Sequence, residues 1–130
     1  MAMSWTAITD DIVYQEGTFA FKYTAGEDLK RGMAVKLSGS TGKVYKGDAN
    51  NEYGVGVVLH DADSGDPVSV WGPGNIVTTR ASGATANYTV GTAVGLGPDG
   101  YVSYNNTTHK MGIVYEAPTA TNGTCKILLI

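Results

Sequence analysis

The sequence predicts an all-β fold, namely a compact antiparallel β-barrel or sandwich built from two weak repeat units with an N-terminal extended arm. Segments in which apolar and polar residues alternate recur along the chain, and glycine, asparagine and aspartate separate them. Beyond the first fifteen residues, no segment keeps the three- and four-residue apolar spacing of a helix. An internal repeat then groups the segments into two sets.

Ten segments fit short strands. In the first of them, large aromatic residues alternate with small or polar ones, so Phe19, Phe21 and Tyr23 should share one face. Gly- and Pro-containing turns at residues 72–75 and 97–100 favour tight antiparallel connections. The predicted strands cover residues 18–23, 33–37, 43–45, 54–59, 67–71, 76–79, 92–96, 101–104, 111–115 and 125–129.

The repeat is clearest where Gly-x-Ala-Val-x-Leu at residues 32–37 recurs at residues 91–96. Three weaker matches follow in the same order, pairing residues 42–45 with 100–103, 55–58 with 111–114, and 68–70 with 125–127. We therefore expect a single β domain over residues 18–130, with repeat units at about 29–71 and 88–129 that share one core. Gly32 and Gly91 should begin equivalent strands, and Val35 and Val94 should point inward.

Residues 1–17 lie outside both repeat units and form the predicted arm. The arm carries an apolar set at helix-like spacing, Trp5, Ile8, Ile12 and Val13. Two interpretations remain open, because the arm could fold back on the core or dock on another chain. Since the repeat units have apolar faces of their own, we expect the core not to need the arm, and we expect the arm to be mobile when free.

Composition excludes several classes of function. The 9 basic and 12 acidic residues give a net charge of -3, so a phosphate-neutralising surface is not expected and nucleic acid is not a predicted partner. No apolar run has the length of a membrane span, and the N-terminus lacks the pattern of a signal peptide. Cys125, the single cysteine, sits in an apolar strand, where its thiol should be buried and unreactive.

No metal site, cofactor or catalytic group is predicted. Asp61, Asp63 and Asp66 form an acidic turn that begins like a calcium loop, but the twelfth position, Gly72, has no carboxylate. We therefore interpret these residues as an ordinary turn, with calcium binding as the minor alternative.

The histidines do not suggest a site either. His60 and His109 are far apart and lack zinc-ligand spacing. A triad drawn from Ser64, His60 and Asp61 would lack the strand–turn–helix elbow that presents a nucleophile. We expect the protein not to be an enzyme.

The segments at residues 54–71 and 75–83, together with 90–96 and 111–114, resemble the small capsid cement or head-decoration proteins of tailed viruses. The resemblance covers about residues 25–130 and carries over no catalytic residues. It implies a compact β fold, usually trimeric, seated on the outside of an icosahedral head where capsomers meet. It also implies that the arm grips the shell, which makes Trp5, Ile8, Ile12 and Val13 the candidate capsid-binding residues.

The predicted function is therefore capsid decoration, with the major capsid protein as partner and a homotrimer as the assembly. The protein would be made in the host cytoplasm and would reside on the outer surface of the virion capsid. The alternative is a carbohydrate- or receptor-binding β module of a phage spike or tail fibre, because eight tyrosines and two tryptophans could provide stacking faces for sugars.

Overall fold

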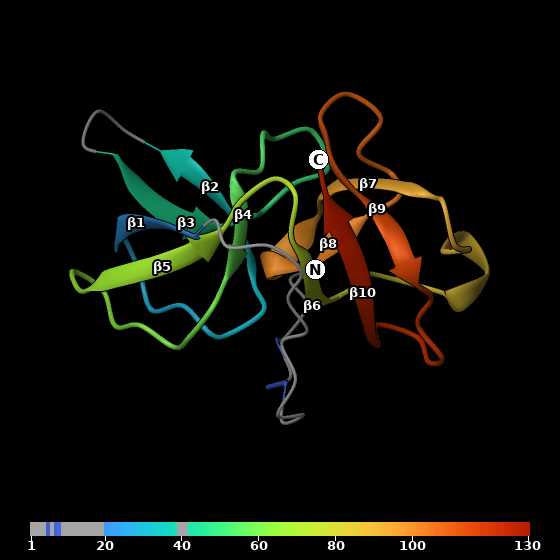
Figure 1. The fold of residues 1–130 in the computed structure, drawn as a ribbon, viewed down its shortest axis with the longest axis horizontal. Helices are drawn as coiled ribbons and strands as arrows, with labels where there is room; N and C mark the ends of the chain where they lie inside the picture. The colour runs from blue at the N-terminus through green and yellow to red at the C-terminus, as the bar shows by residue number, and fades with distance from the viewer. Residues whose placement is uncertain (1–4, 6, 9–19, 39–41) are drawn as a thin grey trace.

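The computed structural model describes residues 5, 7–8, 20–38 and 42–130, and in this part the chain is all-β. Two units lie side by side along the longest axis of the molecule (Figure 1). The first is a closed barrel, and the second is a five-stranded sheet with two short 3-10 turns. Every segment predicted to be a strand overlaps an observed one.

The barrel contains β1 (Ala20–Ala25), β2 (Ala34–Ser38), β3 (Lys43–Lys46), β4 (Gly56–Val58) and β5 (Pro67–Trp71). The second unit contains β6 (Ile76–Arg80), η1 (Thr85–Asn87), β7 (Ala93–Leu96), η2 (Pro98–Gly100), β8 (Val102–Ser103), β9 (Lys110–Glu116) and β10 (Thr124–Leu129).

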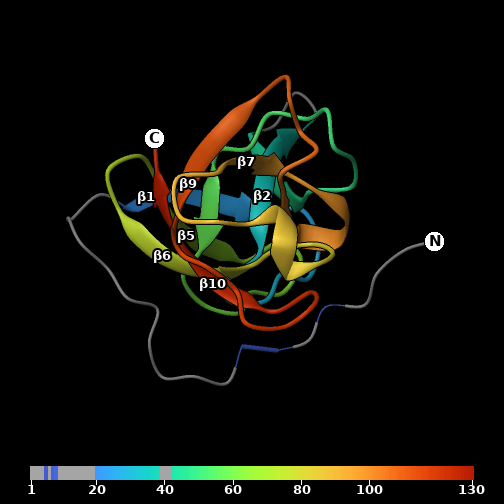
Figure 2. The same cartoon turned by 90° about the vertical axis from the view of Figure 1, so that its right-hand side faces the viewer.

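The two units pair their strands in the same order, as the sequence repeat predicts. In each unit the first strand pairs with the fifth, the second with the third and fourth, and the fourth with the fifth, all antiparallel. The barrel closes through a parallel pair between β1 and β3. A parallel bridge between Ala81, just after β6, and Val102 of β8 occupies the equivalent place in the second unit. Figure 2 looks along the long axis, with the second unit in front of the barrel.

Glycine is needed at the equivalent starts of the second strand in each unit. Gly32 and Gly91 precede β2 and β7 with φ values of 90° and 97°, in the left-handed region where a side chain would be strained. Val35 and Val94, which follow them, are both fully buried, so both point inward as predicted. The repeat in the sequence therefore reflects a shared backbone path.

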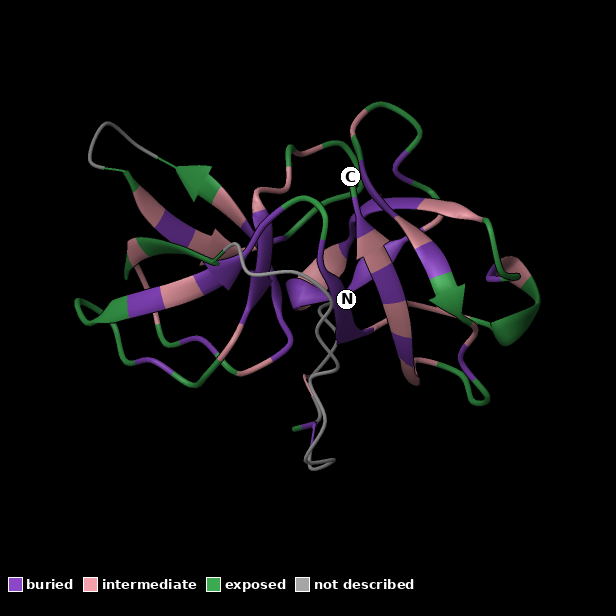
Figure 3. Ribbon diagram, viewed as in Figure 1, coloured by how far each residue is buried: buried purple, intermediate pink, exposed green. Residues whose placement is uncertain are grey.

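The core differs from the single shared core that we expected, because it divides into two clusters. Buried residues occur in both units (Figure 3). The barrel encloses one cluster, and the other fills the second unit and extends onto the barrel. The barrel cluster consists of Ala25, Leu29, Met33, Val35, Val44, Val58, Ala62, Val68 and Val70. The second includes Ala34, Val57 and Trp71 from the barrel and Val77, Tyr88, Val94, Leu96, Met111, Cys125, Ile127 and Leu129, among others, from the second unit.

The division arises because the barrel wall is buried on both faces. Ala34, Val57 and Trp71 are direct neighbours across β2, β4 and β5, and they face the second unit. The residue beside each of them along the strand is packed inside the barrel. A strand buried on both faces forms a continuous apolar run rather than an alternating one. The cluster on the outer face of this wall, which contains residues of both units, thus holds the two units together.

Candidate functional site

The residues of the N-terminal segment that the structure describes lie against the junction between the two units. Ile8 is 6% exposed, and its Cδ1 atom lies 2.3 Å from where a Cβ on Gly32 would be. The absent side chain of Gly32 therefore makes the space that Ile8 fills. Arg31 Nη2 donates a hydrogen bond of 2.7 Å to the carbonyl oxygen of Ile8, which fixes this backbone to the barrel.

Trp5 reaches the second unit. Its ring packs edge-on against Tyr101, with centroids 5.1 Å apart and an interplanar angle of 74°. The guanidinium of Arg80 lies 5.9 Å from the centre of the Trp5 ring, within the range of a cation–π contact. Arg80 Nη2 also donates to the carbonyl oxygen of Ala7 at 3.4 Å. Residues 5–8 therefore bridge the barrel and the second unit.

The contacts of residues 5, 7 and 8 with the two units correct one expectation about the arm. We predicted that the core would not need residues 1–17 to bury its apolar surface, but Ile8 is buried and Trp5 packs against the barrel cluster. The cause is the space that Gly32 leaves open and the packing of Trp5 against Tyr101, which is only 2% exposed; no local pattern in the arm reveals either contact. Ile12 and Val13, the other two predicted capsid-binding residues, lie outside the described residues.

A cavity of about 440 Å³ opens beside this seat. Charged and polar side chains share its lining with apolar residues of the segment. His60 is fixed there by two hydrogen bonds, because its Nε2 accepts from the Ser69 amide at 3.2 Å and its Nδ1 contacts the Asp61 carbonyl oxygen at 2.9 Å. The lining residues are Ala7, Ile8, Lys30, Arg31, Leu59, His60 and Asp61.

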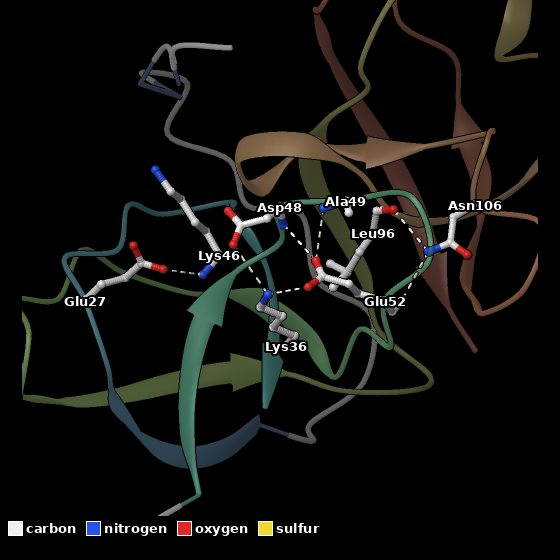
Figure 4. Close-up of polar contacts among 8 residues, drawn as sticks. All are labelled: Glu27, Lys36, Lys46, Asp48, Ala49, Glu52, Leu96 and Asn106. Atoms are coloured by element: carbon white, nitrogen blue, oxygen red, sulfur yellow. Dashed lines mark hydrogen bonds and ion pairs between the residues drawn. The ribbon is translucent and has the colours of Figure 1, made fainter. Parts of the chain in front are cut away.

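A polar network holds the connection between β3 and β4 in place (Figure 4). Glu52 Oε1 accepts hydrogen bonds from the amides of Asp48 and Ala49 at 2.8 and 3.0 Å, and Lys36 Nζ bonds to Glu52 Oε2. Lys36 Nζ also lies 3.4 Å from Asp48 Oδ2. The Glu52 carboxylate therefore links the β3–β4 connection to the Lys36 side chain of β2.

The charges of Lys36 and Glu52 stabilise each other. Burial alone would raise the pKa of Glu52, but the hydrogen bonds from Lys36 and the two amides outweigh burial and leave the pKa below its ordinary value. Burial would likewise lower the pKa of Lys36, but its bonds to Glu52 and the nearby carboxylate of Asp48 raise it. Both groups are therefore held in their charged forms.

Asn106 carries the network across to the second unit. Its side chain is fully buried, and its Nδ2 donates to the carbonyl oxygens of Glu52 at 3.0 Å and Leu96 at 3.1 Å. Its Oδ1 accepts from the His109 amide at 2.9 Å. Lys46 Nζ adds an ion pair with Asp99 of 2.7 Å across the same junction. Sequence analysis missed Asn106, because an amide in a polar turn has no distinguishing pattern.

Asp61 and Asp63 of the acidic turn accept hydrogen bonds from backbone amides, one in another connection and one within the turn. Asp61 Oδ1 accepts from the Arg31 amide at 2.8 Å, and the carbonyl oxygen of Asp63 accepts from the Asp66 amide at 3.0 Å. Among the described residues, no group of three or more His, Cys, Asp or Glu side chains could hold a metal ion. Cys125 is buried, and burial raises its pKa to about 12, as its place in an apolar strand predicted.

Over the described ranges, no helix has both the length and the apolar character needed to cross a membrane.

The first comparison is with a solved structure and concerns the fold alone. The chain is similar to the head fiber gp8.5 N base of bacteriophage phi29, with a TM-score of 0.59 and 17% sequence identity. The match covers 86% of this chain and 93% of that one. At this identity the likeness establishes a shared fold. No curated protein sequence matches the chain.

The family is established by sequence. The model of the phage cement protein family matches residues 13–129, which is most of the chain. The chain therefore belongs to the phage cement protein family, and it is a structural protein associated with the phage head.

Proposed function

We propose that this protein decorates the outer surface of the icosahedral head and stabilises the shell by bridging neighbouring capsomers, without catalysing a reaction. The observation that carries the proposal is the family match over residues 13–129. The low share of charged residues, 16%, and the mutual satisfaction of polar groups at the junction suit a rigid body that works by contact. The partner in this proposal is the major capsid protein.

The N-terminal segment has two parts in this proposal. Trp5 and Ile8 already contact this chain, so they cannot offer the same surfaces to a partner. We assign them the task of seating the segment at the junction, and we assign the capsid contact itself to Ile12 and Val13. Residues 1–17 then act as the arm, and residues 18–130 act as one β domain whose two units share the cluster around Trp71.

Assembly as a homotrimer would multiply a weak contact. Three linked arms bind with an avidity well above that of one arm when the geometry lets all three engage. The same linkage would let one trimer hold several capsid subunits against expansion. Light scattering of the purified protein should give three times the chain mass, and a monomer at all concentrations would remove the trimer from the proposal.

The attachment is tested by co-sedimentation with expanded, undecorated heads. The double variant Ile12→Asp and Val13→Asp should bind the heads at least tenfold more weakly, because a charge must be desolvated in an apolar contact. Its melting temperature should stay near that of the wild type. Full binding by this variant would place the capsid contact on the β domain. A collapsed melting temperature would show that Ile12 and Val13 belong to the core.

A further inference from the structure

A second open surface lies on the second unit and reaches the connection between β3 and β4 of the barrel. It is a groove of about 370 Å³ bounded by η1, η2, the end of β8 and the connection between β9 and β10. Figure 2 faces the second unit, with the β9–β10 connection below β9. The groove is lined by Asn50, Ser82, Gly83, Asn87, Pro98, Ser103, Tyr104, Asn105, Thr121 and Asn122.

The lining has no charged side chain, although the protein carries 9 basic and 12 acidic residues. Amide and hydroxyl groups take their place. Within the described part of the chain, the side-chain amides of Asn50, Asn87 and Asn105 have no hydrogen-bond partner in the protein. Each side-chain amide offers two N–H donors and a carbonyl acceptor. A ligand whose hydroxyl groups both donate and accept hydrogen bonds would match them.

The groove also has an aromatic wall. Tyr104 is half-buried, and its ring packs edge-on against Tyr88, with centroids 5.6 Å apart and an interplanar angle of 87°. The Tyr88 hydroxyl donates to the Ser82 carbonyl oxygen at 2.5 Å and accepts from the Tyr104 amide at 3.3 Å. The Tyr104 ring is therefore held in position by neighbours in the protein.

The rest of the groove is held as firmly. Asn122 Oδ1 accepts a hydrogen bond from the backbone amide of Gly83 at 2.6 Å, and the backbone amide of Asn122 donates to the Gly83 carbonyl oxygen at 3.0 Å. Arg80 Nη1 donates to the Asn122 carbonyl oxygen at 3.1 Å. Because these loops are fixed to each other, a ligand would not need to order them, which lowers the entropic cost of binding.

From this combination we propose that the groove binds a neutral oligosaccharide. Sugar rings present hydroxyl groups, which pair with amides, and C–H faces, which pack on aromatic rings such as Tyr104. Phosphorylated or carboxylated ligands would favour a lining with Arg or Lys, which this groove lacks. The groove lining includes none of residues 5, 7 and 8, so a head-bound copy could present the groove to carbohydrate of a cell surface.

The test uses the full chain and an array of neutral bacterial surface oligosaccharides, followed by titration calorimetry with each sugar bound. Thr121→Arg should block the groove, because Thr121 is an exposed lining residue and arginine would fill the space and add charge. Thr119→Arg is the matched control, since Thr119 is exposed in the same connection but does not line the groove. Asn105→Ala removes one amide without adding bulk.

We expect the wild type and Thr119→Arg to bind the same sugar with equal affinity. Thr121→Arg should weaken binding at least tenfold, and Asn105→Ala by roughly threefold to tenfold, as the loss of one or two hydrogen bonds predicts. Co-sedimentation of Thr121→Arg with heads should be unchanged, which separates this site from the capsid contact. Three results would overturn the proposal: no binding to any neutral sugar at roughly 10 mM, equal binding by Thr121→Arg, or binding only to acidic sugars.

Discussion

Truncating Ile8 should destabilise the protein, because Ile8 is 6% exposed and fills the space above Gly32. Burying an isoleucine contributes about 2 to 5 kcal/mol relative to alanine, and a site at the edge of the core belongs near about 2 kcal/mol. For a chain of 130 residues, this loss of free energy of unfolding corresponds to a fall in melting temperature of roughly 7 °C. Differential scanning calorimetry of Ile8→Ala and of the wild type measures this fall in melting temperature.

Val90→Ala is the matched control, since Val90 is also β-branched but is 69% exposed. Its melting temperature should stay within about 2 °C of the wild type, because exposed apolar residues contribute little. If Ile8→Ala melted like Val90→Ala, the segment would not be seated on the junction, and the arm would be independent of the core as the sequence alone suggested.

A double-mutant cycle tests the contact itself. Gly32→Ala should destabilise the wild type for two reasons, the φ of 90° and the approach of the new Cβ to Ile8 Cδ1. In the Ile8→Ala background only the first reason remains, so the cost of Gly32→Ala should fall by about 1 kcal/mol. Equal costs in the two backgrounds would mean that Ile8 does not pack over Gly32.

Three further predictions follow from the core and the polar network. Gly56→Ala should yield little folded protein in expression and circular dichroism trials, because its Cβ would lie 2.0 Å from the Trp71 carbonyl oxygen; a stable variant would refute this close approach. The pKa of Glu52 is depressed in the folded state, so the stability that Glu52 contributes should be present above its ordinary pKa of 4.5 and be lost as the pH falls further. Urea titrations across this range should show a smaller fall in the free energy of unfolding for Glu52→Gln than for the wild type. Parallel curves for the two proteins would exclude the Glu52 network as the source of the fall. Cys125, whose pKa is raised to about 12, should react with a thiol reagent at pH 8 only after unfolding, so rapid native labelling would contradict its burial.

The strands were predictable because their signals are local. Alternating apolar residues separated by glycine identify each strand from a short stretch of sequence, and the repeat around Gly32 and Gly91 indicates that two sets of strands share one order. The two-cluster core was not predicted. It depends on the second unit covering Ala34, Val57 and Trp71, which come from three separate strands.

The sites were less predictable because their parts come from remote segments. The seat of Trp5 depends on Tyr101 and Arg80, and no spacing in the sequence connects these residues. The buried amide of Asn106 finds its partners at Glu52 and Leu96 only after the two units meet. A polar residue in a turn gains a role of this kind from tertiary proximity, so its identity alone does not reveal it.

Electron microscopy of heads purified with and without this protein tests the central claim most directly. Capsid decoration predicts added density at many equivalent lattice positions on the outer surface, where neighbouring capsomers meet, and greater resistance of the decorated heads to heat. Density confined to a few positions, such as those of a spike or tail fibre, or heads equally stable without the protein, would contradict the account.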